Sequence, residues 1–183
     1  MSRCTQCTSG FFTSIYWRKD MQPRVPDKIN HSLITTFICP KLSERSKGNL
    51  HYQVWRNNDD QSLGIAISKN ESSGGFSAEL VKVSDILETL NGLRKTGRAF
   101  HATALKQLFI GKSANNPCFL AAILVDQKVI HPHPNTQRLL EVSGDAEFWE
   151  SRLKEASPEQ HTAAIVNVES SKVGRVAKAT KED

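Results

Sequence analysis

Apolar and polar residues alternate along much of the first half of the chain, and this pattern predicts strands. The run SLITTFIC is rich in β-branched side chains and is followed by Pro40, which is typical of an edge strand. The runs LHYQVWR and LGIAISK flank the turn NNDDQS and predict a hairpin. The run FSAELVKV alternates as well. We therefore predict an antiparallel β-meander over residues 31–83.

The spacing of apolar residues changes at Ser84, and helices are predicted from there on. Asp85 and Glu88 have the acidic start and the spacing of a capping box, and Asn91-Gly92 suits a left-handed C-terminal cap. A helix of about two turns is expected between them. A second helix is predicted over HATALKQLFIG, ending at Gly111 and packing through Ala104, Leu105, Leu108 and Phe109.

The longest apolar run, FLAAILV, allows two interpretations. Asn116 is a good N-cap and Pro117 suits the first helical position, which favours a third helix from Pro117 to about Lys128. The alternative is a buried strand that turns at Asp126-Gln127, because a short apolar run cannot be assigned from its period alone. After this run, KVIHP and RLLEV flank His133-Pro134-Asn135-Thr136 and predict a short hairpin.

A packing helix and two irregular ends complete the predicted organisation. Asp145 is expected to cap the helix AEFWESRLKEA, with Glu147 in its first turn and with Phe148, Leu153 and partly Trp149 on the core. Residues 1–30 are expected to form a flexible arm and residues 158–183 a flexible tail. Met21 offers an alternative start codon, which leaves open whether residues 1–20 belong to the native protein.

The predicted fold class is α+β: an N-terminal β-meander followed, over residues 84–157, by three helices, a β-hairpin and the packing helix. The order of three short helices and a hairpin between Ser84 and Val142 resembles a winged helix-turn-helix domain, without indicating a particular family. The resemblance implies that the third helix enters the major groove of DNA and that the hairpin contacts the backbone. FLAAILV is more apolar than a reading helix should be. Either its exposed face is small, or it is a packing helix and another surface makes the contact.

Composition bounds the class of protein. With 38% hydrophobic residues and a mean hydropathy of −0.42, the 183-residue chain is expected to be soluble and globular. FLAAILV is well short of the roughly 18 to 20 apolar residues that span a bilayer, and the N-terminus lacks a signal-peptide pattern, so we expect a cytoplasmic protein. Cys4 and Cys7 would supply half of a zinc site, but no second pair follows. We expect reduced cysteines, no metal and no cofactor.

Charge changes sign from block to block, and two of the four blocks, residues 1–48 and 89–140, are basic. Residues 89–140 contain seven Lys and Arg against one acidic residue, while residues 49–88 and 141–183 carry an acidic excess. The stretch between Glu88 and Asp126 contains no acidic residue. A one-sign stretch of this kind is a candidate anion-binding face, although a solvated helix surface is the common alternative. Phosphate contacts would give affinity and salt dependence with little sequence reading. The candidate nucleic-acid-binding residues are Arg94, Lys95, Arg98, Lys106, Lys112, Lys128 and Arg138.

Two histidines of the predicted hairpin, His131 and His133, would add positive charge below about pH 6.5. Their ordinary interpretation is as loop residues between prolines. Motifs for catalysis are missing, since the sequence contains no GxSxG, HExxH or Walker loop. Cys118 is expected to be a buried, inert thiol because it starts an apolar helix.

We therefore predict a non-enzymatic nucleic-acid-binding protein, a small DNA-binding regulator or accessory factor whose partner is duplex DNA. The alternative is a protein-interaction module that does not bind nucleic acid. In that case the strand edges of the meander would hold a protein partner or a second copy, together with the aromatic residues Tyr52, Trp55 and Phe76. Neither hypothesis specifies a target sequence, and the residues do not distinguish DNA from RNA.

Overall fold

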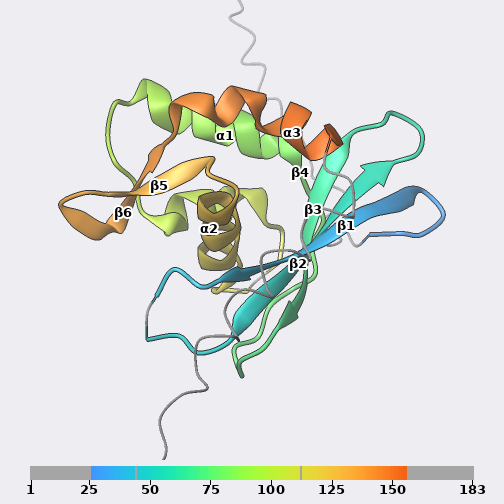
Figure 1. Cartoon of the computed structure of the whole chain (residues 1–183), viewed down its shortest axis with the longest axis horizontal. Helices are drawn as coiled ribbons and strands as arrows, with labels where there is room; N and C mark the ends of the chain where they lie inside the picture. The colour runs from blue at the N-terminus through green and yellow to red at the C-terminus, as the bar shows by residue number, and fades with distance from the viewer. Residues whose placement is uncertain (1–25, 44, 112, 156–183) are drawn as a thin grey trace, which may run out of the picture.

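The structure is a computed structural model that describes residues 26–43, 45–111 and 113–155. Most of the predicted arm and all of the predicted tail lie outside these ranges. A four-stranded antiparallel sheet is followed by a lobe of helices and a β-hairpin, so the α+β class is confirmed (Figure 1). In chain order the elements are β1 (His31–Pro40), β2 (Asn49–Asn57), β3 (Leu63–Asn70), β4 (Val81–Lys82), α1 (Val83–Lys95), the 3-10 helix η1 (Ala102–Leu108), α2 (Asn116–Asp126), β5 (Ile130–His133), β6 (Thr136–Val142), the 3-10 helix η2 (Gly144–Phe148) and α3 (Trp149–Glu155).

The large sheet has the strand order β1-β2-β3-β4, which confirms the predicted hairpin between β2 and β3. Its core face carries Phe37 of β1 opposite Tyr52 of β2, with ring centroids 5.2 Å apart. The predicted fourth strand is mostly wrong, because β4 has only two residues. Ser77 instead bonds to Asn116 at the start of α2, and Glu79 accepts from Ile110 and Gly111 between η1 and α2.

Helix α1 is longer than predicted and starts without the predicted capping box. Its N-cap is Lys82, which makes no side-chain capping bond. The helix passes through Gly92 because Leu93 packs against the core beyond it. It ends where Gly97 adopts a φ of +63° and donates its N–H to the carbonyl of Arg94. The left-handed glycine that terminates the helix is therefore Gly97.

The second predicted helix and the packing helix differ from expectation in their details. Residues Ala102–Leu108 form a 3-10 helix, and the chain leaves it before Gly111, whose N–H donates to Glu79. A 3-10 turn, η2, precedes α3, and Asp145 makes no capping bond. In α3 the indole of Trp149 is fully buried, whereas Phe148, which was expected to pack, is 64% exposed.

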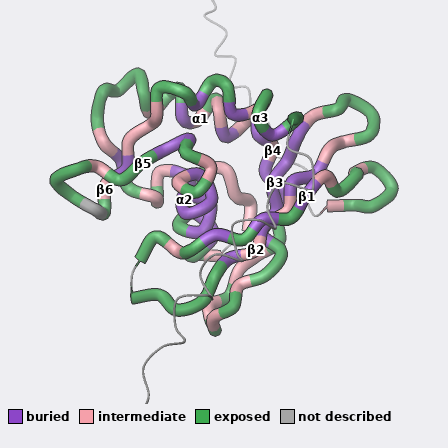
Figure 2. The backbone as a smooth tube through the Cα atoms, viewed as in Figure 1, coloured by how far each residue is buried: buried purple, intermediate pink, exposed green. Residues whose placement is uncertain are grey.

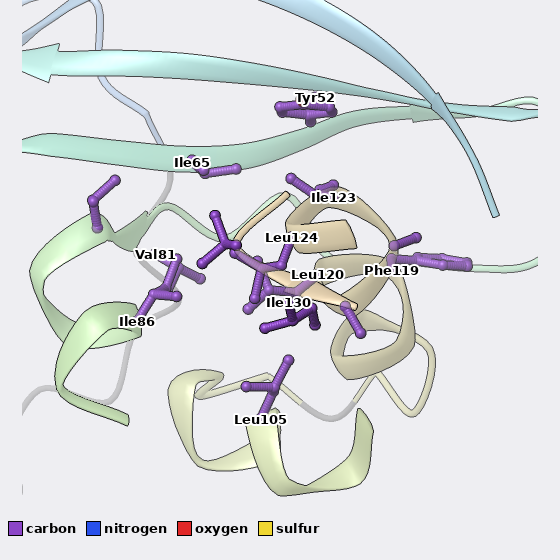
Figure 3. Packing of buried hydrophobic residues seen from close by; sticks show 14 of the residues in the cluster. Tyr52, Ile65, Val81, Ile86, Leu105, Phe119, Leu120, Ile123, Leu124 and Ile130 are labelled. Carbon is purple, nitrogen blue, oxygen red and sulfur yellow. The ribbon is translucent and has the colours of Figure 1, made fainter. Parts of the chain in front are cut away.

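Helix α2 settles the choice between helix and strand for FLAAILV in favour of the helix. It lies between the four-stranded sheet and the β5–β6 hairpin, and most of its length is buried (Figure 2). Leu120, Ile123 and Leu124 pack with Tyr52 of the sheet and Leu105 of η1 (Figure 3). The sheet and the helical lobe thus share one hydrophobic core.

Candidate nucleic-acid interface

The connector, which here means residues 93–101 from the last turn of α1 to the start of η1, is joined to the β5–β6 hairpin by a short backbone pairing. Phe100 N–H donates to the carbonyl of Leu140 at 2.9 Å, and Leu140 N–H donates back to Phe100 at 2.8 Å. Arg98 precedes this bridge by two residues, and Arg138 stands two residues before Leu140 on β6. Figure 1 shows the connector running from the end of α1 to the hairpin. Because the bridge is antiparallel, Arg98 and Arg138 lie on opposite sides of it, so the pairing links the connector to the hairpin without placing these two residues next to each other.

Arg94, Lys95 and Arg98 are all exposed around the end of α1. The Arg94 guanidinium lies 3.2 Å from Glu147 in η2, and both side chains are well exposed to solvent. An ion pair of this kind is weak and readily exchanged for another partner. Arg98 follows the turn at Gly97, and its backbone N–H donates to Thr96 Oγ1. The connector thus presents three guanidinium or ammonium groups, of which one has a nearby carboxylate.

The remaining candidates are more scattered. Lys106 is exposed on η1, and Arg138 is exposed on β6. Lys128 is exposed at the turn between α2 and β5, where it has a φ of +59°. Lys112 lies outside the described residues. The structure therefore places Arg94, Lys95 and Arg98 on the segment that pairs with the strand of Arg138, whereas Lys106 and Lys128 lie on other segments.

The hairpin histidines have an acidic neighbour. His131 and His133 lie 4.0 Å and 3.7 Å from the carboxylate of Glu141 on β6. His133 Nδ1 also accepts the backbone N–H of Asn135, which leaves its Nε2 facing Glu141. Glu141 therefore places a negative charge beside both rings.

Helix α2 is a packing helix. Eight of its eleven residues are buried, among them Asn116 and Pro117 at its N-terminus. The Asn116 amide is fully engaged with Ser77: its Oδ1 accepts the Ser77 N–H at 3.1 Å, and its Nδ2 donates to the Ser77 carbonyl at 2.9 Å. The Asn115 amide donates to the carbonyl of Gly75 at 2.8 Å. The segment before β4 therefore covers the end of the helix that a reading helix would present to the bases.

The buried carboxylate of Glu79 fixes the segment that leads into α2, and it was not predicted from the sequence. Glu79 is 4% exposed. It accepts the N–H of Ile110 at 2.7 Å and that of Gly111 at 3.0 Å. A Cβ on Gly111 would collide with Glu79 Oε1, so the close approach requires glycine. Hydrogen bonds to a charged acceptor are the stronger kind, and these fix the path of the chain between η1 and α2.

A second, partly buried network ties the sheet to the end of α2 and to α3. The Tyr52 hydroxyl donates to Asp126 Oδ2 at 3.0 Å and accepts from Gln127 Nε2. The side-chain oxygen of Gln127 in turn accepts the Trp149 indole N–H at 3.4 Å. The backbone carbonyl of Gln127 accepts from the Arg152 guanidinium. Burial, reinforced by the negative charge of Asp126, raises the pKa of Tyr52 above its ordinary value. Tyr52 is therefore a neutral core residue, and the expectation that it contacts a partner is wrong.

The two described cysteines differ in their exposure to solvent. Cys118 is exposed at the start of α2, which corrects the prediction of a buried thiol. Cys39 is the buried one, and burial, with a further contribution from Asp126, raises the pKa of its thiol to about 12.

These environments predict selective alkylation. At pH 8, iodoacetamide should modify Cys118 in the native protein and leave Cys39 intact, because the thiolate of Cys39 is about 10³-fold scarcer than that of a free thiol. Peptide mapping by mass spectrometry measures both sites. Cys39 should react once urea unfolds the chain, and equal labelling of the two in the native state would contradict the structure.

Trp55 and Phe76 belong to the alternative, protein-interaction surface predicted from the sequence. Trp55 is 7% exposed and packs with Ala66 and Leu80 in a small second cluster. Its indole N–H is buried and has no hydrogen-bond partner among the described residues. Phe76 is half-buried against the main core. Leu33 and Ile38 of the edge strand β1, in contrast, are 47% and 46% exposed.

Further features bound what the site can hold. Within residues 26–43, 45–111 and 113–155, no group of three or more His, Cys, Asp and Glu side chains could bind a metal ion. The cysteine pair Cys4 and Cys7 lies outside these ranges. None of the described helices combines the length and the apolar character that crossing a membrane requires.

Comparison with protein-family models, with curated proteins and with solved structures finds no match to this chain.

Proposed function

We propose that this protein is a non-enzymatic, cytoplasmic DNA-binding regulator or accessory factor. The connector after α1 and the β5–β6 hairpin bind the phosphate backbone of a duplex. The observation that carries the proposal is the pairing of Phe100 with Leu140, which places Arg98 and Arg138 on adjoining backbone segments. Exposed basic groups on two such segments can follow a line of phosphates, which a single basic turn cannot do.

The arrangement of the lobe supports the same proposal. Three helical segments, α1, η1 and α2, precede the β5–β6 hairpin, which is the order of the winged helix-turn-helix resemblance. In that class of domain the hairpin contacts the DNA backbone. The connector is exposed and basic, and the hairpin adds the exposed Arg138, whereas α2 is buried.

The proposal is tested by fluorescence anisotropy of the full chain with a labelled mixed-sequence duplex. Contacts from Arg94, Lys95, Arg98 and Arg138 should give a log–log salt slope of about −3.6, since each phosphate contact contributes about −0.9. Affinity should then fall about 100-fold between about 50 and 200 mM salt. Absence of binding at the lowest salt would contradict the proposal.

A protein-interaction role for the sheet is the competing proposal. It is favoured by one observation, the half-exposed Leu33 and Ile38 on the outer face of β1. A second copy of the chain or a protein partner would cover them. Because these residues belong to the sheet, this role predicts that reversing the charges of the connector has no effect on function.

A further inference from the structure

The burial of α2 limits how a duplex can be recognised. This inference rests on the proposed function. A helix that reads bases must lay a polar face in the major groove and reach base edges with side chains such as Arg, Asn or Gln. In α2 the exposed residues are Cys118 near its start and Asp126 at its end. A carboxylate at Asp126 would repel phosphate, and it already accepts the Tyr52 hydroxyl.

The polar side chains closest to the start of α2 already form hydrogen bonds within the protein. Asn116 is fully buried, with both amide atoms bonded to Ser77. Asn115 is exposed, but its Nδ2 donates to the carbonyl of Gly75. Releasing either amide would leave a backbone group of residues 75–77 without its partner, which disfavours a rearrangement on binding.

The flanks of α2 are covered as well. The helix packs between the sheet, η1 and β5, and its apolar residues belong to the common core (Figures 2 and 3). Exposing a polar face to the groove would require these elements to separate. Such a separation would expose the residues of the core.

We propose that the ligand is duplex nucleic acid bound without base readout, through its phosphate backbone alone. The connector and the hairpin supply the contacts, and α2 serves as the internal support that holds them in position. The protein would then cover DNA of any sequence, as an accessory or architectural factor does. Its target would not be defined by a particular operator.

The experiment uses the full chain and a library of duplexes with a randomised central segment, selected through several rounds of binding and then sequenced. We expect the bound pool to be retained at low salt with no enriched motif. An enriched motif would overturn this inference while leaving the proposed function intact. Failure to retain any duplex at low salt would overturn the proposed function itself.

Two variants test which part of the protein contacts the duplex. Cys118→Glu adds a carboxylate to the exposed position near the start of α2, where a negative charge is compatible with the helix N-terminus. It should change affinity by less than about twofold, because no phosphate approaches α2. Arg98→Glu should weaken binding by about tenfold or more. A loss in Cys118→Glu as large as that in Arg98→Glu would overturn the inference.

Discussion

Replacement of Trp149 by alanine is expected to lower the free energy of unfolding by about 3 to 5 kcal/mol, which is the cost of removing a large aromatic side chain from a packed core. Trp149 is fully buried in the common core, and its indole N–H donates to Gln127. Its loss would leave a cavity between α3 and the rest of the lobe, together with an unpaired amide oxygen on Gln127. Urea denaturation followed by far-ultraviolet circular dichroism measures the change.

The neighbouring residue is the matched control. Phe148 is also aromatic but is 64% exposed, so Phe148→Ala should change the free energy of unfolding by less than about 0.5 kcal/mol. The two substitutions remove side chains of similar size from adjacent positions. Equal effects, or a larger effect at Phe148, would show that α3 does not pack through the face that carries Trp149.

This pair also shows why part of the fold could not be predicted from the sequence. In AEFWESRLKEA, neighbouring aromatic residues point about 100° apart on a helix, so the buried one depends on where the helix begins. The structure places a 3-10 turn over residues 144–148 and starts α3 at Trp149. The sequence carries no clear signal for that change of phase. In the same way, α1 passes Gly92 and ends before Gly97, because tertiary packing of Leu93 outweighs the local cap signal.

Other elements were predictable because a strong local pattern and a tertiary requirement agree. The alternation in LHYQVWR and LGIAISK predicts β2 and β3, whose alternate residues face the core. The burial of α2 follows from FLAAILV itself, since a helix that is apolar on all sides belongs in the interior.

The candidate interface was predictable only as a set of basic residues. The charge pattern identifies Arg94, Lys95, Arg98 and Arg138, but their relation depends on the bridge between Phe100 and Leu140. A single pair of residues forty positions apart leaves no periodic trace in the sequence. Glu79 is similar, because its partners are backbone N–H groups, which every non-proline residue offers equally.

Reversal of the connector charges should have the largest effect on function. The triple variant Arg94→Glu, Lys95→Glu, Arg98→Glu removes three of the four basic groups assigned to the interface and puts repulsive charges in their place. We expect the affinity for duplex DNA at low salt to fall by about 100-fold or more. The salt slope should also become shallower by about three, since each lost phosphate contact reduces it by about one. All three side chains are exposed, so the fold should persist.

The measurement that tests the central claim most directly compares this variant with one of equal charge. Arg45, Lys47 and Lys69 are exposed on the β1–β2 loop and on β3, and none of them belongs to the connector or the hairpin. Their reversal to glutamate changes the net charge by the same amount. With anisotropy titrations on one duplex, and circular dichroism to confirm folding, we expect binding to be lost only in the connector variant. Equal losses in both variants, or retained binding in the connector variant, would contradict a nucleic-acid interface formed by the connector and the hairpin.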